Sequence, residues 1–190
     1  MECHTLFPTT LYTDIINESS RLELLKLCNN FVPRTHETLL NIKNFNSTLH
    51  SNNNLRQEIN THPVVIETFE FIKNSIKRFL KMRQQPYFEE DLNPYGFFSD
   101  MKEGAYLRKH AHRDCRFSGI IYLEIGEDVP PLVFHDPRPV IGVEPSRYQS
   151  IPVLPIYPKE GMFLLWDHWL EHEVYQKTND NPRKSFTFNI

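Results

Sequence analysis

The sequence has few cysteines, little excess charge and no long apolar run. Its three cysteines, Cys3, Cys28 and Cys115, are odd in number and widely spaced, which excludes a disulfide framework and a zinc site of paired cysteines. A formal net charge of -3 argues against nucleic acids and anionic membranes as partners, because both attract an excess of positive charge. No apolar stretch approaches the roughly 18 residues of a membrane span, and the N-terminal residues do not resemble a secretory signal. We therefore expect a soluble, cytoplasmic protein.

The rest of the composition is that of a folded globular chain. Apolar residues make up 39% of the 190 residues and aromatic residues 13%, which is typical of a protein with a core of its own. We expect a single domain over residues 1–190. The character of the sequence changes near residue 93, so a helical support region over residues 1–92 is expected to precede a strand-rich core over residues 93–190.

Two amphipathic segments in the first half predict helices. Residues 14–31 place leucine and isoleucine among polar residues, and residues 62–84 carry apolar residues at spacings of three and four. Pro63, two residues after Thr61, is typical of a helix start. The polar stretch 33–60, with its S-N-N-N segment, is interpreted as a loop. The apolar stripe of the second helix needs a sheet to cover.

The second half predicts about eight short strands, because runs of Phe, Tyr, Val and Ile alternate there with turn residues. Such a series favours a β-sandwich or jelly roll over a parallel sheet, so the expected fold class is mainly β with N-terminal helices (α+β). Six of the 14 prolines lie in residues 137–158, a stretch that predicts a loop over a pocket. The predicted strands are 94–100, 104–111, 117–125, 131–135, 151–156, 161–167, 172–176 and 183–189.

Histidines and an aspartate in this half have the spacing of a metal site. In the segment H-A-H-R-D, His110, His112 and Asp114 share one side if residues 105–114 are extended, since alternate side chains of a strand point the same way. His172, in the segment W-L-E-H, would add an imidazole from a distant strand. A facial set of imidazole and carboxylate groups leaves coordination positions open, as a non-haem Fe(II) oxygenase requires.

Five segments, taken in order, resemble the signature of a 2-oxoglutarate/Fe(II)-dependent oxygenase family and, more distantly, that of prolyl hydroxylases. They are G-A-Y-L-R-K-H-A-H, F-S-G-I-I-Y-L, V-F-H-D-P-R, W-L-E-H and R-K-S-F-T-F-N. The resemblance covers about residues 90–190. It implies a double-stranded β-helix, a jelly roll of cupin-like form, buttressed by about two helices. It also implies Fe(II), 2-oxoglutarate as co-substrate, and O2.

The resemblance and the chemistry of the residues disagree about one ligand. The family places a glycine six positions before its first ligand histidine, and Gly104 stands six positions before His110. That register makes His110 and His112 the near pair. The usual superfamily pair is His-x-Asp, which His112 and Asp114 would supply, and a carboxylate would offset part of the iron charge. His112 belongs to both pairs, and the third ligand stays open between His110 and Asp114.

The resemblance also assigns the remaining site residues. His172 is the implied distal ligand, with His168 as an alternative four residues earlier. Arg183 matches the family cation that pairs with the C5 carboxylate of 2-oxoglutarate, which a guanidinium grips through two parallel hydrogen bonds. Ser185 shares its side of the strand. Tyr122 resembles a tyrosine that contacts the same carboxylate in prolyl-hydroxylase-like relatives.

Other residues have structural readings as well as functional ones. Phe117, Phe163 and Trp166 are expected to line a dry pocket. The segment Asp136-Pro137-Arg138 predicts a turn with an ion pair, and the functional alternative is that Arg138 or His135 reaches the substrate.

The predicted activity is hydroxylation of an amino acid, peptide or small metabolite, with release of succinate and CO2. Two rivals are a cupin-like three-histidine metal enzyme that does not use 2-oxoglutarate, and a non-catalytic β-sandwich binding protein. Arg183 and Ser185 argue against the first rival, because a site that does not use 2-oxoglutarate needs no buried partner for a carboxylate. The primary substrate and the oligomeric state have no pattern in the sequence.

Overall fold

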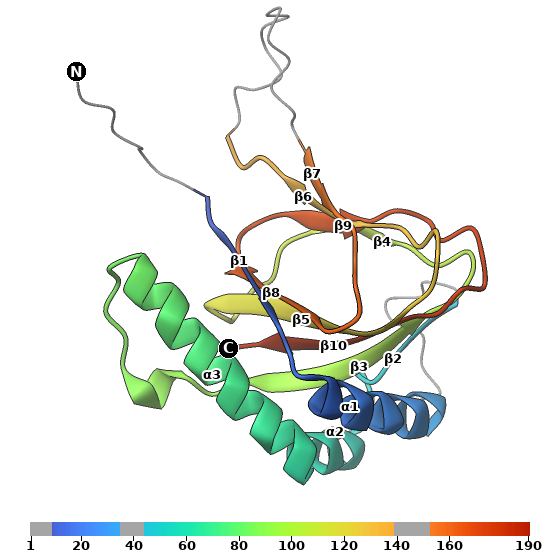
Figure 1. The fold of residues 1–190 in the computed structure, drawn as a ribbon, viewed down its shortest axis with the longest axis horizontal. Helices are drawn as coiled ribbons and strands as arrows, with labels where there is room; N and C mark the ends of the chain where they lie inside the picture. The colour runs from blue at the N-terminus through green and yellow to red at the C-terminus, as the bar shows by residue number, and fades with distance from the viewer. Residues whose placement is uncertain (1–8, 35–43, 139–152) are drawn as a thin grey trace, which may run out of the picture.

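Two antiparallel sheets lie one above the other in the computed structural model, which describes residues 9–34, 44–138 and 153–190 (Figure 1). The larger sheet has six strands in the order β1-β8-β5-β10-β3-β2, and the smaller has four in the order β4-β9-β6-β7. From β3 to β10 the chain passes back and forth between the sheets, which is the connection pattern of a jelly roll. The predicted arrangement is therefore the observed one.

The strand bounds agree with the eight predicted strands to within three residues. The larger sheet consists of β1 (Leu11–Ile15), β2 (Phe45–Ser47), β3 (Tyr95–Met101), β5 (Phe117–Ile125), β8 (Met162–Asp167) and β10 (Arg183–Asn189). The smaller consists of β4 (Leu107–His110), β6 (Leu132–His135), β7 (Val153–Ile156) and β9 (His172–Val174). Residues 139–152 of the predicted loop lie outside the described residues, as do the first two residues of the strand predicted at 151–156.

Three helices precede β3: α1 (Glu18–Phe31), α2 (Asn53–Asn60) and α3 (Pro63–Met82). The predicted start of the first helix at residue 14 is wrong, because residues 14 and 15 belong to β1. Asn17 caps α1, since its side-chain oxygen accepts a hydrogen bond from the Ser20 amide at 2.8 Å. The third helix has His62 as its cap and Pro63 in its first turn, which confirms the prediction to within two residues.

The interpretation of residues 33–60 as a loop is wrong, because β2 and α2 lie in this stretch. The segment S-N-N-N is a helix start: the Asn52 side chain accepts from the Leu55 amide at 2.9 Å, and asparagine is among the preferred caps. Leu55 and Ile59 are buried. The region before residue 93 also supplies β1 and β2, the two edge strands of the larger sheet, so it is more than a helical support.

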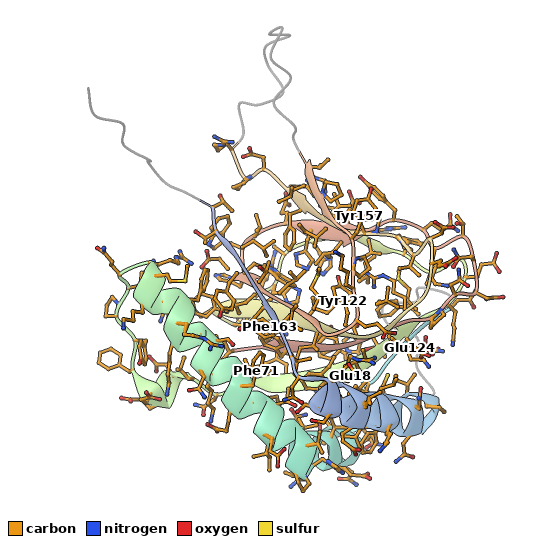
Figure 2. All side chains as sticks on the ribbon, viewed as in Figure 1. Glu18, Phe71, Tyr122, Glu124, Tyr157 and Phe163 are labelled. Atoms are coloured by element: carbon orange, nitrogen blue, oxygen red, sulfur yellow. The ribbon has the colours of Figure 1, made fainter. Side chains whose placement is uncertain are left out.

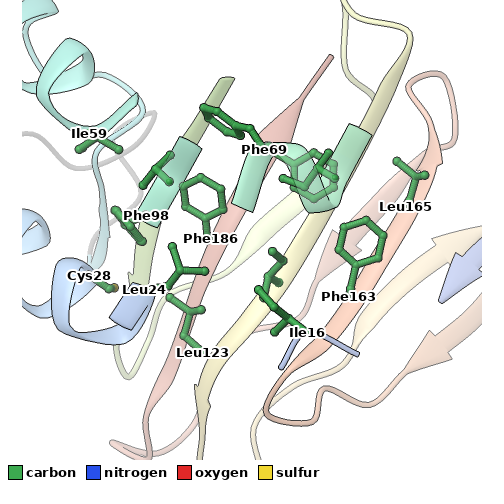
Figure 3. Close-up of a cluster of buried hydrophobic side chains, with 14 of the residues drawn as sticks. Ile16, Leu24, Cys28, Ile59, Phe69, Phe98, Leu123, Phe163, Leu165 and Phe186 are labelled. Atoms are coloured by element: carbon green, nitrogen blue, oxygen red, sulfur yellow. The ribbon is translucent and has the colours of Figure 1, made fainter. Parts of the chain in front are cut away.

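The helices cover the outer face of the larger sheet and bury an apolar cluster there (Figure 3). From β10, Phe186 and Phe188 point into this cluster, and both are fully buried. Phe117 and Phe163 belong to the same cluster, so the prediction that they line a pocket is wrong. Phe163 packs edge-on against Phe71 of α3, with ring centroids 5.3 Å apart (Figure 2).

The inner face of the larger sheet contacts the smaller sheet through a second cluster, which contains Ile120, Tyr122 and Trp166 together with Leu132 and Phe134 of β6. Tyr122 lies between the sheets in Figure 2. Side chains alternate along a strand, so β5 and β8 each supply both clusters, while β10 supplies the first cluster on one side and cavity-wall residues on the other. Within the described part of the chain, no helix is long and apolar enough to cross a membrane.

Candidate active site

A cavity of about 740 Å³ lies between the two sheets. Its wall includes three histidines, His110, His112 and His172, and two residues of β10, Arg183 and Ser185. The sequence predicted one site with His112, His172, Arg183 and Ser185 and with His110 or Asp114 as a further ligand, and the structure brings His110 to the same cavity as the other four. Aromatic side chains of β3 and the neighbouring segments form much of the remaining wall, including Phe45, Tyr95, Phe97 and Tyr106.

The three histidines form a cluster of metal-ligand geometry. One ring nitrogen from each lies within 4.8 Å of the others. The ring centroids of His110 and His172 are 4.4 Å apart, and those of His112 and His172 are 5.1 Å apart. Among the described residues this is the one group of three or more potential ligands that meets.

An irregularity in β4 turns His110 toward this cluster. Leu107 pairs with Val174 and His110 pairs with His172, so three steps along β4 match two along β9. Such a bulge changes the direction of a side chain relative to regular alternation. Gly104, which precedes β4, has a φ of +82°, a conformation that glycine adopts without strain.

The assumption that the strand continues to residue 114 is wrong, because β4 ends at His110. His112 lies after the strand and is held by His168 instead: the His112 amide donates to the His168 carbonyl at 2.9 Å, and Nδ1 of His168 donates to the His112 carbonyl at 3.0 Å. His168 therefore anchors the backbone of His112 and does not join the cluster. Asp114 is exposed, has a φ of +59° and is absent from the cluster.

Each of the three imidazoles has its Nδ1 hydrogen-bonded to an oxygen. His110 donates to the Arg108 carbonyl at 2.7 Å, and His172 donates to the Leu170 carbonyl at 2.9 Å. Nδ1 of His112 is 2.8 Å from Oδ1 of Asn189. A carbonyl oxygen only accepts, so each neutral ring carries its proton on Nδ1 and keeps the lone pair of Nε2 for a metal.

Burial keeps two of these rings neutral. The pKa of His172 falls from 6.5 to about 3, mainly because burial disfavours the charged form and secondly because His110 is close. Burial also lowers the pKa of His112, against the Asn189 hydrogen bond, which raises it. Neutral imidazoles are the form that binds metals, so the cluster fits a divalent cation with open coordination positions.

Arg183 lies on the wall of the same cavity and is 3% exposed. Its Nε donates to the Pro130 carbonyl at 3.2 Å, and one terminal nitrogen, Nη2, has no hydrogen-bond partner. Burial lowers the pKa of the guanidinium, which nevertheless stays charged at neutral pH. No carboxylate of the described residues pairs with it, and a buried charge without a counter-ion is costly. An anionic ligand would fit this position.

Further polar groups surround Arg183. The guanidinium lies 5.5 Å from the ring centroid of Tyr122, whose buried hydroxyl has no partner. Ser185 is paired with Tyr122 across β10 and β5 and lines the cavity. Of the three aromatic residues predicted to line a pocket, Trp166 does so. Its buried indole N–H has no hydrogen-bond partner. The unpaired donors near the cavity therefore suit a ligand rich in oxygen atoms.

The segment Asp136-Pro137-Arg138 forms the predicted local ion pair. Nε of Arg138 donates to Asp136 at 2.9 Å, and this contact lowers the pKa of the carboxyl to about 2. His135 instead contacts Glu173 at 2.9 Å. Neither Arg138 nor His135 is part of the cavity wall, so the structural reading of both is the better supported one.

Asn189 and its neighbours are the part of the site that the sequence interpretation missed. Asn189 is 5% exposed and contacts His112, Ser118 and Tyr95. The signal was available, because Asn189 ends the segment R-K-S-F-T-F-N with the same strand parity as Arg183 and Ser185.

Residues 98–189 match the model of the family described as "Putative 2OG-Fe(II) oxygenase". This segment contains all three clustered histidines together with Arg183. It is a 2OG-Fe(II) oxygenase domain. The predicted resemblance is therefore confirmed, and this oxygenase belongs with the dioxygenases that use Fe(II), 2-oxoglutarate and O2.

Solved structures confirm the double-stranded β-helix fold of the oxygenase. A prolyl-4-hydroxylase of Pseudomonas putida is 13% identical, with a TM-score of 0.65 over 96% of this chain and 92% of that one. A prolyl hydroxylase of Trichoplax adhaerens, in complex with a hypoxia inducible factor peptide fragment, is 14% identical, with a TM-score of 0.59 over 95% and 81%. HygX of Streptomyces hygroscopicus, with nickel, 2-oxoglutarate and hygromycin B bound, is 8% identical, with a TM-score of 0.55 over 95% and 83%. None of the curated proteins matches the sequence significantly.

Proposed function

We propose that this oxygenase binds Fe(II) through His110, His112 and His172 and hydroxylates its substrate. The observation that carries the proposal is the meeting of one ring nitrogen from each of three histidines on the same cavity as a buried arginine with an unpaired Nη2. Three imidazoles leave coordination positions for a co-substrate and oxygen. The same cavity then holds both a metal and an anion.

Arg183, Ser185 and Tyr122 are proposed to bind the C5 carboxylate of 2-oxoglutarate. The unpaired Nη2 of Arg183 and the hydroxyl of Tyr122 would each gain an acceptor, and a charge-assisted pair in a buried site is strong. When bound, Fe(II) with 2-oxoglutarate and O2 supplies the oxidising chemistry and releases succinate and CO2. The chain contributes binding, orientation and exclusion of water.

The substrate is proposed to enter along the aromatic part of the cavity wall, past Tyr95, Phe97 and Tyr106. Two neighbours in fold carry a peptide fragment and hygromycin B, respectively, so the same fold accommodates both a peptide and a small molecule. The proposed substrate class is accordingly an amino acid, a peptide side chain or a small metabolite with an apolar part that contacts these rings.

Anaerobic reconstitution tests the proposal. Protein mixed with Fe(II) and 2-oxoglutarate without oxygen should develop the weak visible metal-to-ligand charge-transfer band, and exposure to O2 should then yield succinate. Arg183→Ala should remove most of the band at a fixed 2-oxoglutarate concentration. Arg138→Ala is the matched control, because Arg138 pairs with Asp136 away from the cavity. Absence of the band in the wild-type protein would contradict the proposal.

The three-histidine arrangement also favours one rival, a cupin-like metal enzyme that does not use 2-oxoglutarate. The unpaired Arg183 argues against it, since such a site needs no buried counter-ion. The two activities separate in one assay: the rival would consume O2 with a suitable substrate and form no succinate, and its rate would be independent of 2-oxoglutarate.

A further inference from the structure

One of the three clustered histidines is oriented differently from the other two. His110 and His172 each donate from Nδ1 to the carbonyl of the residue two positions earlier, Arg108 and Leu170. These acceptors belong to the backbone, and no substitution removes them. Nδ1 of His112 instead contacts a side chain 77 residues away, the Oδ1 atom of Asn189, at 2.8 Å.

The Asn189 amide is itself held at both ends. Its Oδ1 also accepts from the Ser118 hydroxyl at 2.8 Å, and its Nδ2 donates to the Tyr95 hydroxyl at 3.1 Å. Asn189 is 5% exposed and Ser118 is fully buried, whereas Tyr95 is 46% exposed, so water does not compete strongly for the amide oxygen of Asn189. The donor on one side and the acceptor on the other keep the amide oxygen facing His112.

The orientation of this amide decides which nitrogen of His112 is free. With an oxygen at Nδ1 the ring must donate there, and the lone pair of Nε2 stays available. If the acceptor is lost, the proton can move to Nε2, the atom that would face the metal. A partner of this kind outside the ligand set typically changes metal affinity 10- to 100-fold.

We infer that Asn189 is a positioning residue that fixes the ring tautomer of His112 and thereby sets the affinity of the site for metal. The inference rests on the proposed role of His112 as a ligand. It adds that one side chain of β10 orients the metal site, while two others, Arg183 and Ser185, face the co-substrate. Ser118 and Tyr95 hold the amide of Asn189 and do not touch the imidazole.

The decisive comparison uses two isosteric substitutions. Asn189→Leu removes the acceptor, and Co(II) binding to the metal-free protein should weaken at least tenfold. Asn189→Asp keeps an oxygen at Nδ1, so Co(II) affinity should stay within about threefold of the wild type or rise, because a carboxylate increases the basicity of its imidazole. Equal losses in both variants would overturn the inference, since they would indicate a packing role. Unchanged affinity in Asn189→Leu would also overturn it.

Two further variants separate positioning from general stability. Ser118→Ala and Tyr95→Phe each remove one of the two contacts that hold the Asn189 amide, and the remaining contact should keep the amide oxygen facing His112. Both should lower the melting temperature more clearly than they change Co(II) affinity. A loss of affinity in Ser118→Ala as large as that in Asn189→Leu contradicts the inference.

A measurement without metal or turnover tests the tautomer directly. Ring ¹⁵N chemical shifts of neutral His112 in the metal-free wild type should show the proton on Nδ1, with the resonance assigned by its loss in His112→Gln. A proton on Nε2 overturns the inference even if Asn189→Leu fails to fold. Because this readout needs no 2-oxoglutarate, it stays informative if the proposed activity fails.

Discussion

The two faces of the six-stranded sheet are built by the same strands and have opposite characters. On the helix side, β10 presents Phe186 and Phe188 to a closed apolar cluster. On the cavity side, at the intervening odd-numbered positions, it presents Arg183, Ser185 and Asn189. Side-chain alternation alone separates the two sets, so a register shift of one residue would exchange core and site.

The difference also appears in the unpaired buried groups. Four buried side-chain polar atoms of the described residues have no hydrogen-bond partner, and three of them belong to Tyr122, Trp166 and Arg183 on the cavity side. The fourth belongs to Asp100. Apolar packing makes one face stable without a ligand, whereas the other face holds donors whose desolvation is offset only when a ligand binds.

The largest expected effect is on the cavity face. His172→Ala should abolish turnover and most Fe(II) binding, because it removes a proposed ligand that is 4% exposed, while leaving the fold largely intact. Succinate release and anaerobic Fe(II) titration measure the two losses, and the exposed His50→Ala serves as control. Retained activity in His172→Ala would show that another residue is the distal ligand.

On the helix face a substitution should instead affect the fold. Phe186 is completely buried, and its ring contacts Phe69 of α3 and Phe98 of the neighbouring strand β3. Phe186→Ala should therefore cost about 3–5 kcal/mol of unfolding free energy. Urea unfolding measures the loss. Phe88→Ala, at a side chain that is 67% exposed, should change stability by no more than about 0.5 kcal/mol. Equal losses in the two variants would remove the contrast between core and surface.

Arg183→Ala should separate co-substrate binding from metal binding. Truncation of one partner in a desolvated charge pair costs about 2–5 kcal/mol, so the apparent KM for 2-oxoglutarate should rise at least tenfold, since about 1.4 kcal/mol corresponds to a factor of ten. Arg183→Lys should recover part of the loss, because lysine lacks the bidentate geometry. Fe(II) affinity should hardly change. An unchanged KM in an active Arg183→Ala enzyme refutes the co-substrate assignment.

Acid should weaken the metal-free protein through the cavity face. The pKa of His172 is lowered from 6.5 to about 3, so the unfolded chain binds a proton that the folded protein does not. The contribution of His172 to stability is therefore complete above pH 6.5 and is lost as the pH falls toward 3. Melting temperatures between pH 7 and pH 4 should fall more steeply for the wild type than for His172→Leu. Parallel curves for the two proteins would show that His172 does not contribute to the pH dependence of stability.

The smallest effect is expected at Asp114, the ligand alternative that the structure leaves outside the cluster. Asp114→Asn should leave turnover within about twofold, as for a surface substitution, whereas His110→Ala should abolish it. Fe(II) titration of both variants distinguishes them. The reverse order would make Asp114 the third ligand and would require the segment after β4 to rearrange around the metal.

Much of this architecture follows from periodicity in the sequence. The eight strands and the helix at Pro63 were predictable because alternation and amphipathic spacing continue through each element. Helix α2 was missed because its eight residues hold only two buried apolar side chains, Leu55 and Ile59, too few for a clear period. The edge strands β1 and β2 are short, and edge pairing depends on tertiary contacts that no local pattern encodes.

The sequence predicted the site residues correctly where side chains alternate regularly along a strand, and not where that alternation is interrupted. Arg183 and Ser185 alternate along β10 as expected. The bulge in β4 and the end of that strand at His110 placed His112 and Asp114 differently from regular alternation. Neither feature has a signature in the residues themselves. The anchoring of His112 by His168 joins residues 56 positions apart, a contact that only the folded chain reveals.

The position of β10 also has a consequence for how the molecule is assembled. It lies at the centre of the larger sheet, between β5 and β3, yet it is the most C-terminal of the described strands. During synthesis β3 and β5 emerge first and must each wait with an unpaired edge, and such edges are open to wrong pairing. The strand that fills the gap carries Phe186 on one side and Arg183 on the other. The same strand therefore closes the sheet and completes the binding site, so neither can form before β10 has been synthesised.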